Sequence, residues 1–244
     1  VLALGGRIHT PTLREAWRMG CCGTLLAIHW VLFYGSIKAA NVSVGVVCFA
    51  LNGFFTALLE PMASGKRFSL RDLLLGLITL GGIVLIFGLN MQFRTGIVIG
   101  TFSSLFYTLF AIASKRVQSA TGVESSAMLL YELSTGWCVL SLAMPFYAML
   151  YPSVSLMPEG SDWLFITLFA SVFTIGPFLT QLQALRTLSA FTVNLSYNLE
   201  PLYSIALAML LFNEAQELNL SFWMGVSMIV AAVGYHAMCR KDGE

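Results

Sequence analysis

Eight apolar runs of about 20 residues constrain the fold of this chain more than any other feature, because that length matches the hydrocarbon thickness of a bilayer. The runs are 19–37, 42–63, 73–92, 96–114, 126–151, 163–183, 188–212 and 218–239. Apolar and polar residues do not alternate within them, which excludes a transmembrane barrel. The breaks between them are too short for a soluble domain. The sequence therefore predicts an all-α integral membrane protein with eight complete transmembrane helices.

The scarcity of charge supports the same class. Only 10% of the 244 residues are charged, whereas a soluble domain carries about 25%. This composition excludes a soluble globular protein and a disordered chain. The net charge of +1 gives no electrostatic basis for binding nucleic acid.

Motifs of enzymes and of cofactor or metal sites are missing from the sequence. It has no GxSxG, HExxH or Walker A motif, so we predict no enzyme activity, no cofactor and no metal site. The cysteines lie within apolar runs or at the end of one, and we interpret them as buried thiols without a disulfide framework. They are Cys21, Cys22, Cys48, Cys138 and Cys239.

The basic residues predict the orientation. Eleven of the 13 Lys and Arg residues lie in alternate breaks, and such residues favour the cytoplasmic side. These are Arg7, Arg14, Arg18, Lys66, Arg67, Arg71, Lys115, Arg116, Arg186, Arg240 and Lys241. The other set of breaks holds only Lys38 and Arg94. We therefore expect an inner (plasma) membrane protein that crosses the membrane many times and has a cytoplasmic C-terminus.

An internal repeat appears when the chain is compared with itself at an offset of 148 residues. The matched pairs include Lys38 with Arg186, Asn41 with Ser189, Phe49 with Tyr197, Asn52 with Glu200, and Gly53 with Pro201. The matched spans 42–63 and 188–212 cross the membrane in opposite directions under the predicted orientation, so the two copies are inverted, as in many secondary transporters.

This repeat predicts ten helices in two inverted five-helix halves. Residues 96–244 form the second repeat, and residues 1–95 form a first repeat that lacks its first two helices. The stretch 1–6 is apolar but too short to span a bilayer, and we interpret it as the tail of the second helix. A disordered apolar end is the alternative interpretation.

Several stretches resemble a known family. Residues 198–203 (Asn-Leu-Glu-Pro-Leu-Tyr), residues 210–214 (Leu-Leu-Phe-Asn-Glu) and residues 33–40 (Phe-Tyr-Gly-Ser-Ile-Lys-Ala-Ala) resemble EamA-type repeats of the drug/metabolite transporter superfamily. The resemblance covers essentially the whole chain. It implies a ten-helix transporter and says almost nothing about the substrate. Where the family has a proline in the fourth helix and a closing glutamate, this chain has Gly53 and Lys66, so the first half departs from the pattern.

Polar residues in the middle of the matched spans predict the substrate site. A charged side chain at the bilayer centre costs about 2.5–3.5 kcal/mol, and Glu200 lies at the middle of its span beside the helix breaker Pro201. Its repeat partner Asn52 precedes Gly53, and Asn198 lies at a similar depth to Glu200. Paired helix breaks of this kind mark transporter sites. The alternative is that Glu200 is a hydrogen-bonded packing residue.

Glu132 is the second acid predicted inside the membrane, and it is a further candidate for the cavity. A carboxyl that alternates between neutral and charged forms couples proton movement to substrate movement, so Glu132 and Glu200 are candidates for proton coupling. The alternative for Glu132 is an interhelical hydrogen bond nearer the cytoplasm. Glu60 is predicted to lie at the interface, facing Lys66 or Arg67.

Two further features have structural interpretations. His29 is a lone histidine that we interpret as a satisfied core residue. Four small residues repeat at every fourth position and predict a close contact between helices. They are Gly96, Gly100, Ser104 and Thr108.

These features predict a secondary transporter of a small organic metabolite or drug-like solute that works by alternating access in the lipid bilayer, as a monomer or homodimer. Two other classes remain open. One is an accessory subunit of a lipid-carrier flippase, and the other is a membrane-embedded enzyme that modifies lipid. The direction of transport and the substrate do not follow from the sequence.

Overall fold

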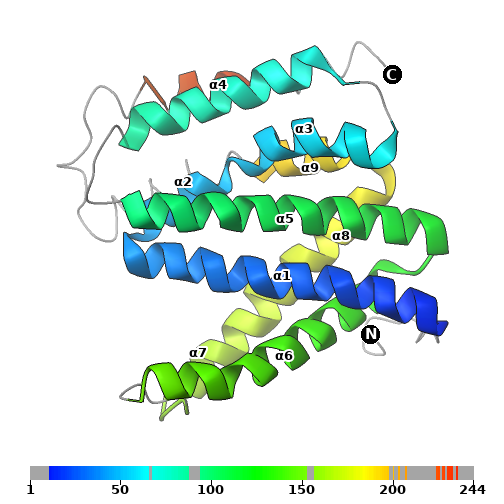
Figure 1. Ribbon diagram of the computed structural model, residues 1–244, viewed down its shortest axis with the longest axis vertical. Coiled ribbons are helices and arrows are strands. Elements are labelled where there is room, and N and C mark those ends of the chain that lie inside the picture. Colours follow the sequence, from blue (N-terminus) through cyan, green and yellow to red (C-terminus); the bar gives the residue numbers. More distant parts are fainter. Residues whose placement is uncertain are drawn as a thin grey trace. The chain divides into compact units, whose positions relative to one another are not determined.

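The structure is a computed structural model that describes residues 11–65, 68–87, 94–152, 157–197 and 200, together with 203, 207, 224, 225, 227, 228, 230–232 and 235. Within these ranges the chain forms helices and turns and no β-strand, so the predicted all-α class is confirmed for them (Figure 1). The elements are α1 (Leu13–Ala39), α2 (Val42–Phe49), α3 (Asn52–Ser64), α4 (Leu70–Phe87), α5 (Arg94–Thr121), α6 (Ser125–Leu150), α7 (Asp162–Leu168), the π-helix η3 (Phe169–Ile175), α8 (Gly176–Thr187) and α9 (Ala190–Ser196).

Five helical segments of the described ranges are long and apolar enough to cross a bilayer. They correspond to the predicted spans 19–37, 42–63, 96–114, 126–151 and 163–183. Helix α4 covers most of the predicted run 73–92, and the described positions between 218 and 239 are helical. The total of eight spans stays a prediction, because residues 88–93 and most residues after 197 lie outside the described ranges.

The chain divides into two compact units, which we describe separately. One comprises residues 1–27 and 113–188, and the other comprises residues 28–112 and 189–244. The division follows contacts and cuts through α1 and α5. It leaves the predicted repeat boundary between residues 95 and 96 untested.

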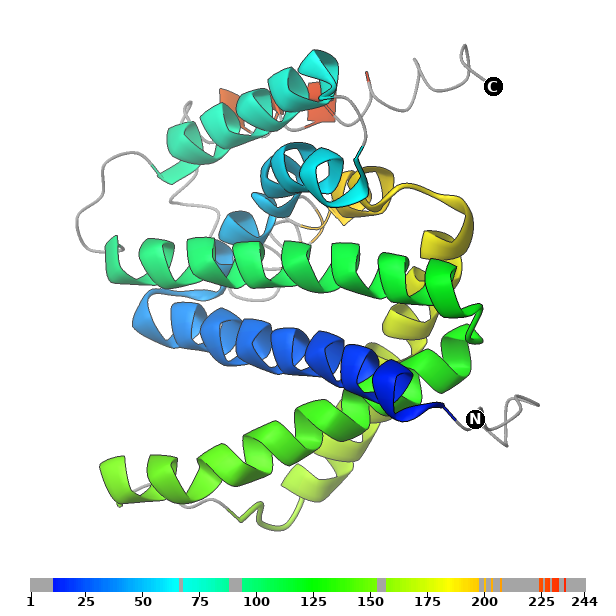
Figure 2. The same ribbon diagram turned by 45° about the vertical axis from the view of Figure 1, so that its right-hand side comes forward.

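In the unit of residues 28–112 and 189–244, α3 packs against both α4 and α9 (Figures 1 and 2). Glycine permits the close approach of α4. A Cβ on Gly76 would lie 2.8 Å from the Cα of Phe54, closer than side chains tolerate. Helix α3 therefore occupies the middle of this unit, where its residues Asn52, Thr56 and Ala57 are buried.

The predicted contact of the small residues on α5 is confirmed in the same unit. A Cβ on Gly100 would lie 2.7 Å from the Cβ of Cys48. A Cβ on Gly96 would collide with Ala40, and the Gly96 carbonyl accepts a 2.7 Å hydrogen bond from the Ser36 hydroxyl. The first half of α5 thus packs directly against the backbone of its neighbours, as small residues allow in membrane helices.

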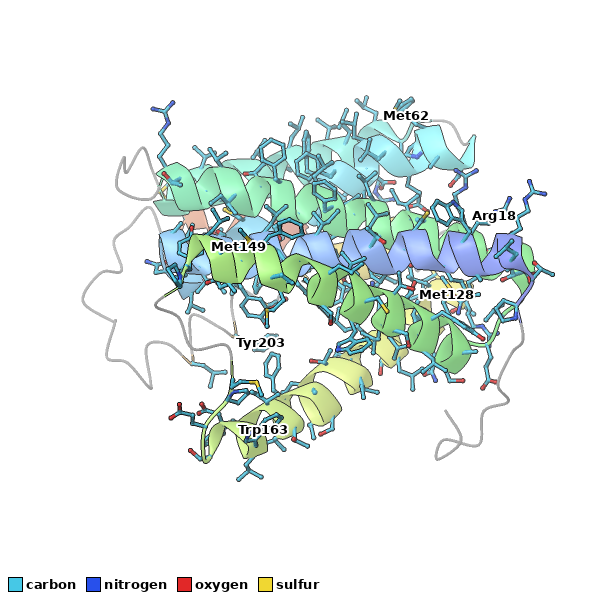
Figure 3. The ribbon with its side chains drawn as sticks, turned by 60° about the horizontal axis from the view of Figure 1, so that its bottom comes forward. Arg18, Met62, Met128, Met149, Trp163 and Tyr203 are labelled. Atoms are coloured by element: carbon cyan, nitrogen blue, oxygen red, sulfur yellow. The ribbon has the colours of Figure 1, made fainter. Side chains whose placement is uncertain are left out.

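In the unit of residues 1–27 and 113–188, α6 packs on α8 and on the start of α1. A side chain at Gly23 would collide with the backbone of Glu132, so glycine sets this crossing. The exposure of α6 rises along its length: Met128 is fully buried and Met149 is 80% exposed (Figure 3). Large apolar side chains also lie exposed on α7, among them Trp163. Such a surface suits contact with lipid tails.

The π-helix η3 interrupts the predicted span 163–183. The Thr174 hydroxyl donates to the carbonyl of Phe169, five residues earlier, at 3.1 Å. A π-turn inserts an extra residue into a helix and often accompanies function. Pro177 follows η3 and lacks the N–H that would continue the α-helical ladder, which gives a physical reason for the irregularity.

Candidate functional site

The predicted break in the span 42–63 exists, but it lies at Ala50 and Leu51 rather than at Gly53. The N–H groups of Ala50 and Leu51 donate to the carbonyls of Val47 and Cys48, three residues earlier, at 3.0 and 3.1 Å. This tight turn separates α2 from α3, and Gly53 lies inside α3. The predicted break at Gly53 is therefore corrected to Ala50 and Leu51, and Gly53 continues the helix α3. The physical reason is that backbone carbonyls at the end of α2 accept hydrogen bonds from another helix.

Hydroxyl groups on α5 donate hydrogen bonds to the backbone carbonyls at this break. The Ser104 hydroxyl lies 2.6 Å from the Cys48 carbonyl and 3.0 Å from the Phe49 carbonyl, and donates to them. One turn along α5, the Thr108 hydroxyl donates to the Asn52 carbonyl at 3.2 Å. A buried carbonyl without a partner costs about 1–3 kcal/mol. Ser104 and Thr108 therefore do more than allow close packing, because their hydroxyls also bond the backbone at the break. The spacing of the small residues alone does not predict this role.

The Asn52 side chain is the strongest indication of a site. It is fully buried, and neither its amide nitrogen nor its amide oxygen has a hydrogen-bond partner among the described residues. Only its backbone carbonyl is engaged, by Thr56 at 2.6 Å and by Thr108. Buried polar groups are normally satisfied. An unsatisfied amide at a helix break can donate one hydrogen bond to a ligand and accept another.

Aromatic rings gather beside the break. Phe49, at the end of α2, lies with its ring centroid 4.6 Å from that of Tyr107, 5.4 Å from that of His29 and 5.9 Å from that of Tyr197. Phe33 packs on the same ring at 6.0 Å. The sequence offered Phe49 and Tyr197 only as a matched pair of the repeat, and this pairing was the signal that could have found the cluster.

Two polar contacts hold this aromatic cluster in place. The Nδ1 atom of His29 lies 3.0 Å from the Ser103 carbonyl and 2.9 Å from the Ser103 hydroxyl, so His29 is a satisfied core residue, as predicted. The rings of Tyr107 and Tyr197 pack edge to face with their centroids 5.9 Å apart. The cluster is thus ordered by hydrogen bonds as well as by ring packing.

The other predicted site residues are distributed as follows. Glu200 is helical and half-buried, and it follows Tyr197 of the aromatic cluster by three residues. Asn198 and Pro201 lie outside the described residues. The predicted roles of Glu200, Asn198 and Pro201 therefore stay predictions.

Glu132 belongs to the other unit and is described by itself. Its side chain is fully buried, and its Oε1 atom accepts a 2.6 Å hydrogen bond from the Ser114 hydroxyl on α5. Its Oε2 atom has no hydrogen-bond partner among the described residues. Glu132 therefore makes the interhelical hydrogen bond that was one of its two interpretations, and keeps one oxygen that a proton or a ligand can engage.

Comparisons with known proteins agree with this architecture. Residues 94–235 match the model of the EamA-like transporter family, which confirms the resemblance seen in the sequence. A protein of known crystal structure matches with a TM-score of 0.67 and 21% sequence identity, over 95% of this chain and 80% of the other. At that identity the likeness shows a shared fold alone. No curated protein matches the chain.

Proposed function

Because the chain belongs to the EamA-like transporter family, we propose that it is a secondary transporter of a small organic solute. In this mechanism the two inverted halves move relative to each other, so that the site opens to one side of the membrane at a time. The orientation is that given by the basic residues, with the C-terminus in the cytoplasm and the protein in the inner membrane. No ATP-binding motif occurs in the sequence, so the driving force is an ion or solute gradient.

The course of two segments supports the inverted arrangement. Phe49, at the start of the break, contacts Tyr197, and Glu60, in the last turns of α3, contacts the backbone at Ala190 and Phe191. The chain therefore runs in opposite directions along the two segments. The offset of 148 residues pairs Phe49 with Tyr197, and matched residues that touch each other lie on the two-fold axis that relates inverted copies.

The observation that carries the proposal is the buried, unsatisfied amide of Asn52. We assign to it a hydrogen-bonding group of the solute that both donates and accepts. Phe49 of the aromatic cluster lies three residues before Asn52, and Glu200 lies three residues after Tyr197 of the same cluster. These groups suit a polar solute with an apolar or aromatic portion.

We assign proton coupling to Glu200 and Glu132, the two acids inside the predicted transmembrane spans. Glu200 is the first candidate because it lies nearest the aromatic cluster. Glu132 is the second, through the carboxylate oxygen that Ser114 leaves free. A buried carboxyl is retained in membranes mainly where it takes part in ion or proton movement.

The test is transport by the purified full-length protein in proteoliposomes, screened against a mixture of cellular metabolites. We expect a small set of solutes to accumulate, and Asn52→Ala to abolish their accumulation. The matched control is Thr79→Val, because Thr79 is equally buried and its hydroxyl donates to its own helix at Leu75. A wild-type rate in Asn52→Ala would remove Asn52 from the site. Accumulation of no solute by the wild type would count against transport by this chain alone.

A further inference from the structure

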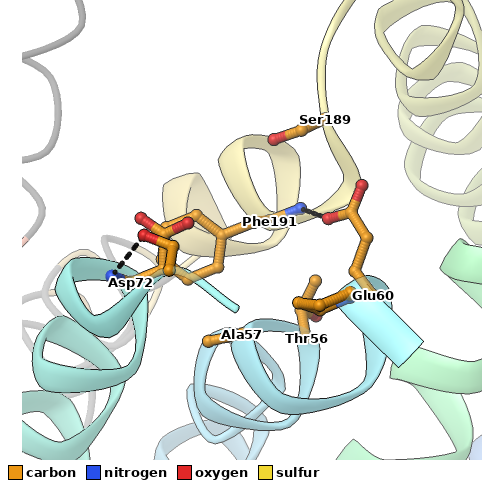
Figure 4. Close-up of a pocket in the computed structure, with 8 residues that line it drawn as sticks. Thr56, Ala57, Glu60, Asp72, Ser189 and Phe191 are labelled. Carbon is orange, nitrogen blue, oxygen red and sulfur yellow. Dashed lines mark hydrogen bonds between the residues drawn. The ribbon is translucent and has the colours of Figure 1, made fainter. Parts of the chain in front are cut away.

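Glu60 connects two distant parts of the chain. It lies near the end of α3 with 7% of its side chain exposed. Its Oε2 atom accepts a 2.9 Å hydrogen bond from the N–H of Phe191, and its Oε1 atom accepts a 3.3 Å bond from the N–H of Ala190 (Figure 4). The carboxylate of Glu60 therefore turns to the start of α9, a partner that the sequence did not suggest, while Lys66 and Arg67, which it was predicted to face, lie outside the described residues.

Helix chemistry explains why this contact is favourable. The first N–H groups of a helix have no partner within it, and they carry the positive end of the helix dipole. Ser189 caps α9 locally by accepting from the N–H of Thr192 at 3.0 Å. Glu60 caps the two N–H groups that Ser189 does not reach, and it comes from a residue 130 positions earlier.

The surroundings of the contact are loosely packed. A cavity of about 100 Å³ adjoins it, between α3, the start of α4 and the start of α9 (Figure 4). Its lining includes Thr56, Ala57, Ser69, Asp72, Ser189 and Phe191. Ala57 and Phe191 form a buried apolar contact beside this cavity. The Glu60 carboxylate adds two hydrogen bonds to that apolar contact.

The sequence places no acid at the matched position of the repeat. The offset of 148 residues pairs Glu60 with Ala208, which lies outside the described residues, and it pairs Ala190 with Val42, the first residue of α2. Helix α2 is capped by its own Asn41, whose side chain accepts from the N–H of Val44 at 2.8 Å. An alanine side chain has no group that accepts a hydrogen bond, so the sequence provides a carboxylate at one of the two matched positions and not at the other.

We propose that Glu60 is a latch that holds the inner ends of α3 and α9 together and biases the resting transporter toward the state closed on the cytoplasmic side. The proposal rests on the alternating-access function above. Inward opening breaks the two hydrogen bonds from the start of α9, and the asymmetry with Ala208 makes that opening harder than opening on the outer side. Glu60 acts as a positioning residue for the gate and does not touch the solute.

The test measures the accessibility of the latch region in the full-length protein. In a background with all five cysteines replaced, Ala57→Cys places a thiol in the wall of the cavity. A membrane-impermeant maleimide is added to inside-out vesicles, where it reaches the cytoplasmic face. With Glu60 present we expect slow labelling. With Glu60→Gln we expect labelling about fivefold faster, because charge-assisted hydrogen bonds become neutral ones.

Asp72→Asn is the matched control, since it removes an acid from the same cavity without touching α9, and its labelling should match the parent. An equal increase in Asp72→Asn, an unchanged rate in Glu60→Gln, or an increase seen only from the outer face overturns the latch. Glu60→Asp keeps the charge with a shorter reach and should label at an intermediate rate. If Glu60→Gln does not reach the membrane, the labelling rate of Glu60→Asp compared with the parent provides the test.

Labelling requires no solute, so the latch and the transport function are tested separately in the same preparations. Faster labelling of Glu60→Gln without accumulation of any solute supports the latch and counts against transport. Solute accumulation with unchanged labelling supports transport and overturns the latch.

Discussion

Phe49 and Tyr197 contact each other with their ring centroids 5.9 Å apart, although 148 residues separate them in the chain. Each occupies the same position of the two matched stretches. Asn52 and Glu200 follow three residues later in their own segments, and the segments run in opposite directions. Two unlike polar groups, an amide and a carboxyl, therefore flank one shared aromatic contact, which gives the proposed site two chemically different sides.

Replacing Asn52 by leucine separates stability from function. The Asn52 amide is buried without a hydrogen-bond partner among the described residues, and the burial of such a group costs about 1–3 kcal/mol. We expect Asn52→Leu to unfold at equal or higher temperature than the wild type in detergent and to lose transport. Thermal unfolding and proteoliposome uptake measure the two effects. A marked loss of stability together with retained transport would assign Asn52 to packing.

Replacing Glu200 by glutamine tests proton coupling. We expect Glu200→Gln to reach the membrane normally and to lose the dependence of transport on an imposed pH gradient. Uptake at two external pH values, with the internal pH fixed, measures this. Glu124→Gln is the control, because Glu124 is an exposed acid just before α6. If Glu200→Gln keeps the wild-type response to the gradient, Glu200 carries no coupling proton.

The glycines of α5 predict a pair of alanine variants with opposite outcomes. A Cβ at Gly100 would lie 2.7 Å from the Cβ of Cys48 and 2.8 Å from the Ser36 hydroxyl. We expect Gly100→Ala to lower the free energy of unfolding by about 1–3 kcal/mol through overpacking. Gly35→Ala meets only Ile99, at 3.6 Å, and should be neutral. Thermal unfolding of both variants checks this, and equal melting temperatures would contradict the close contact.

Removing the Ser104 hydroxyl tests what maintains the break between α2 and α3. Ser104→Ala removes the donor to the Phe49 carbonyl and one of the two donors to the Cys48 carbonyl, and we expect the free energy of unfolding to fall by about 1–3 kcal/mol. Thr101→Val is the comparison on the same helix, because the Thr101 hydroxyl bonds only its own helix, at Ile97. A restored α-helix across Ala50 and Leu51 would limit the loss. Proteoliposome uptake would then fall, since the break positions Asn52.

The sequence predicts those features whose cause is local. The spacing of Gly96 and Gly100 along one helix face is sufficient to predict a close contact, because helix geometry repeats within a few residues. The repeat likewise relates Phe49 to Tyr197 without knowledge of the fold. The helical class, both ends of α6, the last residues of α1 and the first residues of α5 follow from the positions of the apolar runs, whereas α1 begins earlier and α5 ends later than its run.

Features whose cause lies far along the chain were predicted wrongly or missed. Gly53 was named as the break because it matches Pro201 in the repeat, whereas the break lies at Ala50 and Leu51, beside the hydroxyl of Ser104 on another helix. Glu60 was expected to face nearby bases, and its hydrogen bonds to the start of α9 were missed. The π-turn η3 gave one usable signal, Pro177, whose effect on the preceding turn depends on the local backbone. Long-range hydrogen bonds of this kind are not encoded by spacing.

The hydroxyl of Ser104 has a consequence for biogenesis. It donates to the carbonyl of Phe49, which the ribosome makes 55 residues earlier. The segment from Val42 to Ser64 therefore enters the bilayer before the group that completes its backbone hydrogen bonding has been synthesised. Until α5 inserts beside it, that segment must either remain near the translocon or adopt an unbroken helix that later gives way, so this segment and α5 mature together and not one after the other.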